Sequence, residues 1–136
     1  MKLLNSRTAG FALIVLFGSV MVFQLLLALG LPLTGAAWGG RLDTRPEVLR
    51  IASFVASLVL AFAILVVLEK MGIVRLIKRR KVINGILWFL AAYAVLNTVA
   101  NLLSPGAIER FVMTPLALVA SVLCAIVARA PFVDGQ

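Results

Sequence analysis

Four long apolar runs, separated by short segments rich in glycine, proline or charge, dominate the sequence. They extend over about residues 9–29, 49–68, 82–103 and 112–128. An α-helix needs about 17–25 apolar residues to cross a bilayer, whereas the apolar core of a secretory signal has only about 7–15. We therefore expect residues 1–136 to form a single domain, an all-α integral membrane protein built as a four-transmembrane-helix bundle.

The residues between the runs predict where the helices start and stop. Pro46 is suited to the first turn of the second helix, and Ser104 with Pro105 can cap a new helix after the third. We expect residues 107–111 to form a short interfacial turn. Pro115 lies one turn into the fourth run, where it predicts a bend or a late helix start.

The composition places the chain outside the range of soluble proteins. Hydrophobic residues make up 63% and charged residues 13%, with a mean hydropathy of +1.14. Soluble domains have about 45–50% apolar and about 25% charged residues, so lipid must cover much of this surface. The net charge of +8 does not indicate nucleic acid, because the basic residues flank apolar runs instead of forming a patch with reading groups.

A basic connector, residues 69–81, lies between the second and third runs and predicts the orientation. Short basic loops stay in the cytoplasm, which puts both termini there and leaves the following nine Lys and Arg residues inside: Lys2, Arg7, Lys70, Arg75, Lys78, Arg79, Arg80, Lys81 and Arg129. Four remain outside: Arg41, Arg45, Arg50 and Arg110. We expect a multi-pass protein of the plasma (inner) membrane.

The connector itself has no amphipathic pattern. Its apolar and basic residues do not separate at helical spacing, so we interpret it as a helix extension and a loop instead of a surface helix. At the headgroup level its cations should meet anionic lipids. The residues expected to make this contact are Lys78, Arg79, Arg80 and Lys81.

The chemistry open to this chain is limited. It has no histidine, and its single cysteine, Cys124, lies in an apolar run where it is typical of a packing residue. The acidic residues all fall outside the predicted spans: Asp43, Glu47, Glu69, Glu109 and Asp134. No metal cluster or nucleophile–base pair can be assembled from this set, so we expect neither a cofactor nor an enzyme.

Small residues recur at every fourth position in two spans. The two stripes are Ser53, Ser57 and Ala61 in the second run and Ala117, Ser121 and Ala125 in the fourth. Small residues let helices approach closely in a bilayer, so we expect these stripes to be the close helix contacts. The alternative is a solute path along the same faces.

Polar residues gather in the outer halves of the spans. Tyr93, Asn97 and Asn101 share one face of the third helix at a spacing of four. Together with residues at similar depth they predict an outer polar pocket: Gln24, Ser57, Tyr93, Asn97, Asn101 and Thr114. Polar groups in lipid should point inward and meet, either as interhelical hydrogen bonds or as a pocket. If the polar groups form a pocket, we expect two outer loops to cover it. The loop residues expected there are Trp38, Arg41, Arg45, Glu109 and Arg110.

Two segments carry a resemblance. Residues 32–40 read P-L-T-G-A-A-W-G-G, and residues 109–115 read E-R-F-V-M-T-P. They resemble a family of small, uncharacterised four-span bacterial membrane proteins with an outer-loop P-x-G-x-x-A-W-G-G and an E-R-x-x-M-T-P before the last helix. The resemblance implies residence in a bacterial plasma membrane and transfers no activity.

Two functions remain open from the sequence. The first is a non-enzymatic bundle that binds membrane lipids or a partner membrane protein through its small-residue faces and outer loops. The second is an oligomeric transporter or channel subunit that passes a small neutral or anionic solute through the outer polar pocket.

Overall fold

The structure, a computed structural model, describes residues 5–33, 37 and 45–132. All regular secondary structure in this part of the chain is helical. Its elements are α1 (Ser6–Ala28), α2 (Pro46–Lys70), α3 (Arg80–Leu103), η3 (Glu109–Met113), which is a π-helix, and α4 (Thr114–Arg129). Four helical segments of 23, 25, 24 and 21 residues are long and apolar enough to cross a membrane. The prediction of an all-α chain with four helices of spanning length is confirmed.

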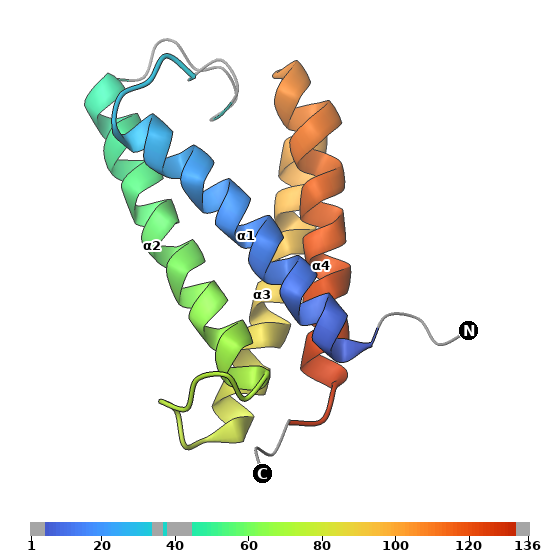
Figure 1. Ribbon diagram of the computed structural model, residues 1–136. Helices are drawn as coiled ribbons and strands as arrows, with labels where there is room; N and C mark the ends of the chain where they lie inside the picture. The colour runs from blue at the N-terminus through green and yellow to red at the C-terminus, as the bar shows by residue number, and fades with distance from the viewer. Residues whose placement is uncertain (1–4, 34–36, 38–44, 133–136) are drawn as a thin grey trace.

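The four long helices alternate in direction (Figure 1). The start of α1, residues 71–79 between α2 and α3, and the chain after α4 therefore lie at one end of the bundle, here called the connector end. The turns after α1 and α3 lie at the opposite end. As expected, α2 continues to Lys70, and an irregular loop follows it.

Glycine ends both α1 and α2 in the same way. Gly30 and Gly72 have φ angles of +89° and +73°, a left-handed conformation that glycine adopts without steric cost. In both turns the glycine amide donates to the carbonyl three residues back, and the next amide donates to the carbonyl five residues back, at 3.0–3.1 Å. This is the Schellman arrangement, which satisfies carbonyls that the helix leaves unpaired.

The helices pack as two hairpins that share one core. α1 packs mainly against α2, and α3 mainly against α4; α1 also meets α4. The shared core takes residues from the connector half of every helix, among them Leu13, Val66, Leu87 and Val127. Toward the opposite end the two hairpins diverge (Figure 1). The two pairs are therefore joined chiefly near the connector end.

The small-residue stripes contribute to the contacts within the chain. The first two members of each stripe are buried: Ser53, Ser57, Ala117 and Ser121. The third members, Ala61 and Ala125, are exposed and half-buried. A step of four residues turns about 40° past a full helical turn, so a stripe of three rotates away from a straight contact line. Packing continues instead through Ala63 and Cys124.

The segment before Pro115 differs from the prediction. Residues 107–111 do not form a separate interfacial turn; the chain is helical from residue 107 and joins α4 through the π-helix Glu109–Met113. Proline has no amide hydrogen, and its ring clashes with the carbonyl four residues back, here that of Phe111. The wider π-turn accommodates this disruption, and a continuous helical span of Glu109–Arg129 results.

Candidate functional site

One buried ammonium group joins several elements at the connector end. Lys70, the last residue of α2, is only 2% exposed. Its Nζ donates to the Oδ1 of Asn84 on α3 at 2.7 Å and to the carbonyl oxygen of Ala128 on α4 at 3.4 Å. The same nitrogen lies 3.8 Å from the centre of the Phe132 ring. Lys70 thus connects α2 to both helices of the other hairpin and to the chain that follows them.

This position suits a cation. The last carbonyls of a helix have no intrahelical partner and carry the negative end of the helix dipole, and Ala128 lies in the last turn of α4. Aromatic ring faces attract cations, and the Phe132 ring also lies 5.2 Å from the guanidinium carbon of Arg80. Lys70, Arg80, Asn84, Ala128 and Phe132 are referred to below as the Lys70 cluster.

The neighbouring carboxylate fixes the connector. Glu69 is 7% exposed, and its two oxygens accept three hydrogen bonds of 2.8–3.0 Å from the backbone amides of Leu76 and Ile77. A buried carboxylate needs such donors, and an irregular loop needs acceptors for its amides. The connector is therefore bonded to the end of α2 by the residue next to Lys70.

The surface of the connector end is strongly basic. Its exposed cations are Arg7, Arg75, Lys78, Arg79, Arg80, Lys81 and Arg129, a set that includes the four residues expected to contact anionic lipid. Over the part of the chain that the structure describes, this end exposes no carboxylate, because Glu69 is buried. The exposed cations described at the opposite end are Arg45, Arg50 and Arg110.

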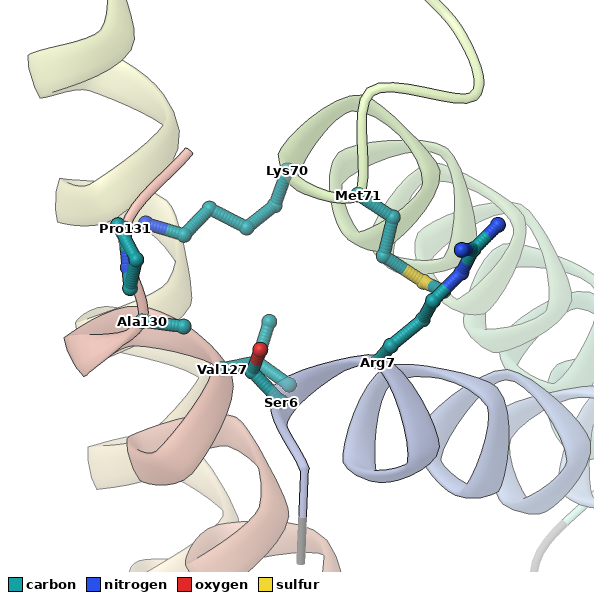
Figure 2. Close-up of a pocket in the computed structure, with 7 residues that line it drawn as sticks. All are labelled: Ser6, Arg7, Lys70, Met71, Val127, Ala130 and Pro131. Atoms are coloured by element: carbon teal, nitrogen blue, oxygen red, sulfur yellow. The ribbon is translucent and has the colours of Figure 1, made fainter. Parts of the chain in front are cut away.

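A small cavity lies beside Lys70 (Figure 2). Its volume of about 20 Å³ is room for roughly one water molecule. Ser6 and Arg7 line it from α1, Lys70 and Met71 from the end of α2, and Val127, Ala130 and Pro131 from α4 and the chain after it. Figure 2 shows the Arg7 guanidinium beside Met71 and directed away from the Lys70 nitrogen.

Two residues of the predicted outer polar pocket bond to their own helices. The hydroxyl of Ser57 donates to the carbonyl of Ser53 at 2.9 Å, and the hydroxyl of Thr114 donates to the carbonyl of Glu109 at 3.2 Å. Such bonds satisfy a hydroxyl locally. Neither group is directed by a hydrogen bond toward another helix.

The other four pocket residues are spread over two helices. Tyr93 is 57% exposed and stacks on Phe89 with ring centres 6.5 Å apart, and Asn97 is exposed. Asn101 and Gln24 are half-buried, and the Gln24 Oε1 is buried with no hydrogen-bond partner. Across the described residues no hydrogen bond joins two members of the predicted pocket.

The divergence of the hairpins explains this exposure. Ile86 and Leu90 lie on the same flank of α3 as Tyr93 and Asn97, at spacings of four, three and four. The two apolar residues pack against the shared core, whereas Tyr93 and Asn97 lie beyond its edge. The expected convergence of these polar groups is therefore not found within a single chain.

The two loops expected to cover the pocket are only partly described. Trp38 and Arg41 lie outside the described residues, and Arg45 is exposed. Glu109 is buried and accepts the hydroxyl of Ser104, while an Nη2 of Arg110 donates to the Ser104 carbonyl at 2.8 Å. These two residues close the turn between α3 and α4.

One interaction at this end has no counterpart among the expected site residues. The Nε of Arg50 donates to the carbonyl of Ala28 at 3.0 Å and so caps the end of α1. The described residues contain no group of three or more Cys, Asp or Glu side chains able to hold a metal ion.

The arrangement of the helices indicates the class of protein. An all-helical bundle with four helices long and apolar enough to cross a membrane is the arrangement of a multi-pass membrane protein. No protein-family model, curated protein or solved structure matches the chain. The family resemblance carried by residues 32–40 and 109–115 therefore stays a prediction.

The Lys70 cluster is the feature that sequence reasoning missed. Lys70 was one of many topogenic cations, and nothing in its neighbourhood distinguished it from Lys78 or Lys81. Asn84 gave one signal, because it is a carboxamide in the first turns of an apolar helix that starts at the same end of the bundle. Phe132 gave none, since its role depends on how α4 packs against α2.

Replacing Lys70 with methionine tests how much this cluster contributes to the stability of the fold. We expect Lys70→Met to lower the free energy of unfolding by about 2–3 kcal/mol, because it leaves Asn84 Oδ1 and the Ala128 carbonyl without their charged donor. Lys81→Met, at an exposed site, should change it by less than about 0.5 kcal/mol. Denaturant titrations in detergent micelles, followed by circular dichroism, measure both. Equal stability of the two variants would contradict the role given to Lys70.

Proposed function

We propose that this protein is a non-enzymatic, multi-pass membrane protein that binds anionic lipid headgroups at its connector end. The observation that carries this proposal is the distribution of exposed charge: seven exposed cations surround the connector end, and its described surface exposes no carboxylate. Each cation close to an anionic membrane surface contributes about 1 kcal/mol of attraction. A loop that is bonded to α2 through Glu69 presents several of these cations together.

The sides of the bundle support the membrane setting. Large apolar residues are exposed around it, among them Phe54 at 53%, Phe89 at 68% and Leu96 at 69%. Water would penalise such a surface, whereas acyl chains cover it without cost. The charged end then lies at headgroup depth, where lipid phosphates are available.

The orientation belongs to the same proposal. The positive-inside rule puts the connector and both termini in the cytoplasm, and the family resemblance favours a bacterial plasma membrane. Labelling of single cysteines in intact cells, in a Cys124→Ser background, tests the orientation. Arg45→Cys should react with an impermeant maleimide in intact cells, and Arg79→Cys only after permeabilisation. The reverse pattern would overturn it.

We favour lipid as the ligand over a protein partner that would bind through the small-residue stripes. Ser53, Ser57, Ala117 and Ser121 are buried within the chain, so most of each stripe is already in use. The outer loops proposed as partner sites are represented by Arg45 and by Glu109 and Arg110, which bond within their own turn.

Neutralising the connector tests the lipid-binding function. We expect the triple variant Lys78→Gln/Arg79→Gln/Lys81→Gln to lower the preference for phosphatidylglycerol over phosphatidylcholine by about a hundredfold, because three surface attractions of about 1 kcal/mol each are removed. Mass spectrometry of the protein released from mixed micelles with its bound lipids measures this preference. Raising the salt concentration should weaken the wild-type preference in the same direction.

A matched pair of single variants controls for the loss of charge alone. Lys81→Gln and Arg45→Gln each remove one exposed cation, at the connector end and at the opposite end respectively. Only Lys81→Gln should lower the preference for phosphatidylglycerol. An unchanged preference in the triple variant would exclude lipid binding at the connector.

A second candidate function, an oligomeric transporter or channel subunit for a small neutral or anionic solute, rests on two carboxamides, one on α3 and one on α1. The carboxamide of Asn97 is exposed on a helix that we place in lipid, and the buried Gln24 Oε1 has no partner. An uncovered carboxamide is costly in a bilayer, so a second copy of the chain covering α3 would stabilise it.

Replacement of Asn97 and Asn101 by leucine separates the two functions. If the protein is a lipid-binding bundle, Asn97→Leu/Asn101→Leu should keep its fold and its phosphatidylglycerol preference, and vesicles with or without it should show the same solute fluxes. A flux of small neutral or anionic solutes that the wild type supports and the folded double variant abolishes would favour the transporter instead.

A further inference from the structure

Two polar side chains lie one turn apart on an exposed flank of α3. Tyr93, which is 57% exposed, and the exposed Asn97 are four residues apart, so they share one side of the helix. Across the part of the chain that the structure describes, neither the Tyr93 hydroxyl nor the Asn97 carboxamide makes a hydrogen bond. The neighbouring Thr98 differs, because its hydroxyl donates to the carbonyl of Ala94 at 2.7 Å.

Both polar groups belong to a helix that we place in lipid. Asn97 precedes the last residue of α3, Leu103, by six positions, which is about 9 Å along the helix axis. Tyr93 lies a further turn inside. Acyl chains offer neither donors nor acceptors, so a carboxamide that faces them loses its hydrogen bonds to water and gains none in return. This flank of α3 therefore favours a partner that brings a donor and an acceptor to the same depth.

The two groups lie on a stripe with the spacing of a helix–helix contact. Four residues follow one another at intervals of three, four and three: Leu90, Tyr93, Asn97 and Ala100. This repeat keeps one side of a helix against a partner helix. Leu90 packs against the shared core, whereas the other three residues are exposed where the hairpins diverge (Figure 1). Tyr93, Asn97 and Ala100 are called the α3 seam below.

The α3 seam has the chemistry of a close contact between helices in a membrane. Ala100 is small, so a second helix is able to approach α3 closely one turn from Asn97. A carboxamide has two N–H donors and a carbonyl acceptor, so two facing Asn97 side chains satisfy each other through reciprocal hydrogen bonds. A seam asparagine of this kind also fixes the register of a parallel helix pair.

A second copy of the chain meets these requirements by symmetry. All copies have one orientation under the proposed topology, so a twofold axis along the membrane normal relates two of them, and each residue near the axis faces its own counterpart. Asn97 then meets Asn97 at the same depth. A different membrane protein would need a matching polar group at that depth, which a second copy has by identity.

We infer that two copies of the chain form a parallel, twofold-symmetric dimer through the α3 seam, with the Asn97 carboxamides of the two copies hydrogen-bonded to each other. The Tyr93 hydroxyl supplies a further donor and acceptor at the same contact. The inference rests on the membrane setting of the proposed function. It is independent of lipid binding at the connector end, because the α3 seam lies in the other half of the bundle.

Dilution within a bilayer tests the dimer. Full-length chains labelled at the N-terminus with a donor or an acceptor dye are reconstituted together in phosphatidylcholine vesicles, and energy transfer is measured as the protein-to-lipid ratio is lowered. The wild type should follow a monomer–dimer equilibrium. Asn97→Leu should dissociate at a ratio about tenfold higher, a change of about 1.4 kcal/mol, which is the size of an interhelical hydrogen bond in model membrane peptides.

Two further variants separate the hydrogen bond from a change in shape. Asn97→Gln keeps both the donors and the acceptor, so it should dissociate within about threefold of the wild-type ratio. Thr98→Val removes the neighbouring hydroxyl, which already bonds within α3, and should match the wild type. Circular dichroism of each variant in the same vesicles checks that the helices are retained.

Cysteine cross-linking in a Cys124→Ser background locates the contact. Ala100 lies on the α3 seam, whereas Val95, which is 50% exposed, lies on the opposite side of the helix. A mild oxidant should link Ala100→Cys chains in pairs at a much higher yield than Val95→Cys chains, because a disulfide needs Cα atoms within about 7 Å of each other.

The results that would overturn the inference are distinct from each other. Wild-type energy transfer no greater than that of randomly distributed monomers at every ratio rejects the dimer. Equal dissociation of Asn97→Leu and the wild type, an equal loss in Thr98→Val, or preferential linking at Val95 rejects the α3 seam.

The dimer and the lipid-binding function fail separately. The triple connector variant should dimerise as the wild type does, and Asn97→Leu should keep the wild-type preference for phosphatidylglycerol. A change in lipid preference without a change in dimerisation therefore concerns the connector end alone, and the reverse result concerns the α3 seam alone.

Discussion

The contact of one buried ammonium with two neighbouring helices is the interaction on which this architecture depends. Each hairpin has its own packing, through Ser53 and Ser57 in α2 and through Ala117 and Ser121 in α4. Between the hairpins, a shared core lies in the connector half of the bundle, and Lys70 bonds to α3 and α4 at its edge. A charged group removed from water is stabilised only with good partners, and here a carboxamide, a helix-terminal carbonyl and a ring face supply them.

Two adjacent residues of opposite charge at the end of α2 bond in different directions. Glu69 bonds to the amides of the connector, and Lys70 bonds to the helices on the other side. Both of these charges are used internally, whereas the remaining connector cations are exposed. The basic surface proposed to bind lipid is thus held in place by a buried pair that takes no part in that surface.

The sequence predicts the helices well because their physical cause is local. Apolar runs of spanning length define the four helices, and the small residues at the first two positions of each stripe are buried as expected. Pro115 predicts a disruption of the helix. Whether the helix ends there or widens into a π-turn depends on the hydrogen bonds that Phe111 and its neighbours make, so the π-helix was not predictable. Likewise, the polar side chain of Asn97 and its place in an apolar helix predict a pocket residue. The divergence of the hairpins, which the sequence does not reveal, leaves it exposed. The Lys70 cluster brings together residues from three separate segments. Their contacts depend on how the helices pack, which no local sequence pattern predicts.

The most direct test of this account is the proximity of Lys70 and Asn84 in a bilayer. Solid-state NMR on protein with ¹⁵N-labelled lysine side chains and ¹³C-labelled asparagine carboxamides reports which of these groups lie within a few ångströms of each other. A separation of 2.7 Å between Lys70 Nζ and Asn84 Oδ1 predicts one strong lysine–asparagine correlation, which disappears in Asn84→Leu. A well-ordered sample that shows no such correlation, or one that persists in Asn84→Leu, would contradict the junction on which the rest of the structure depends.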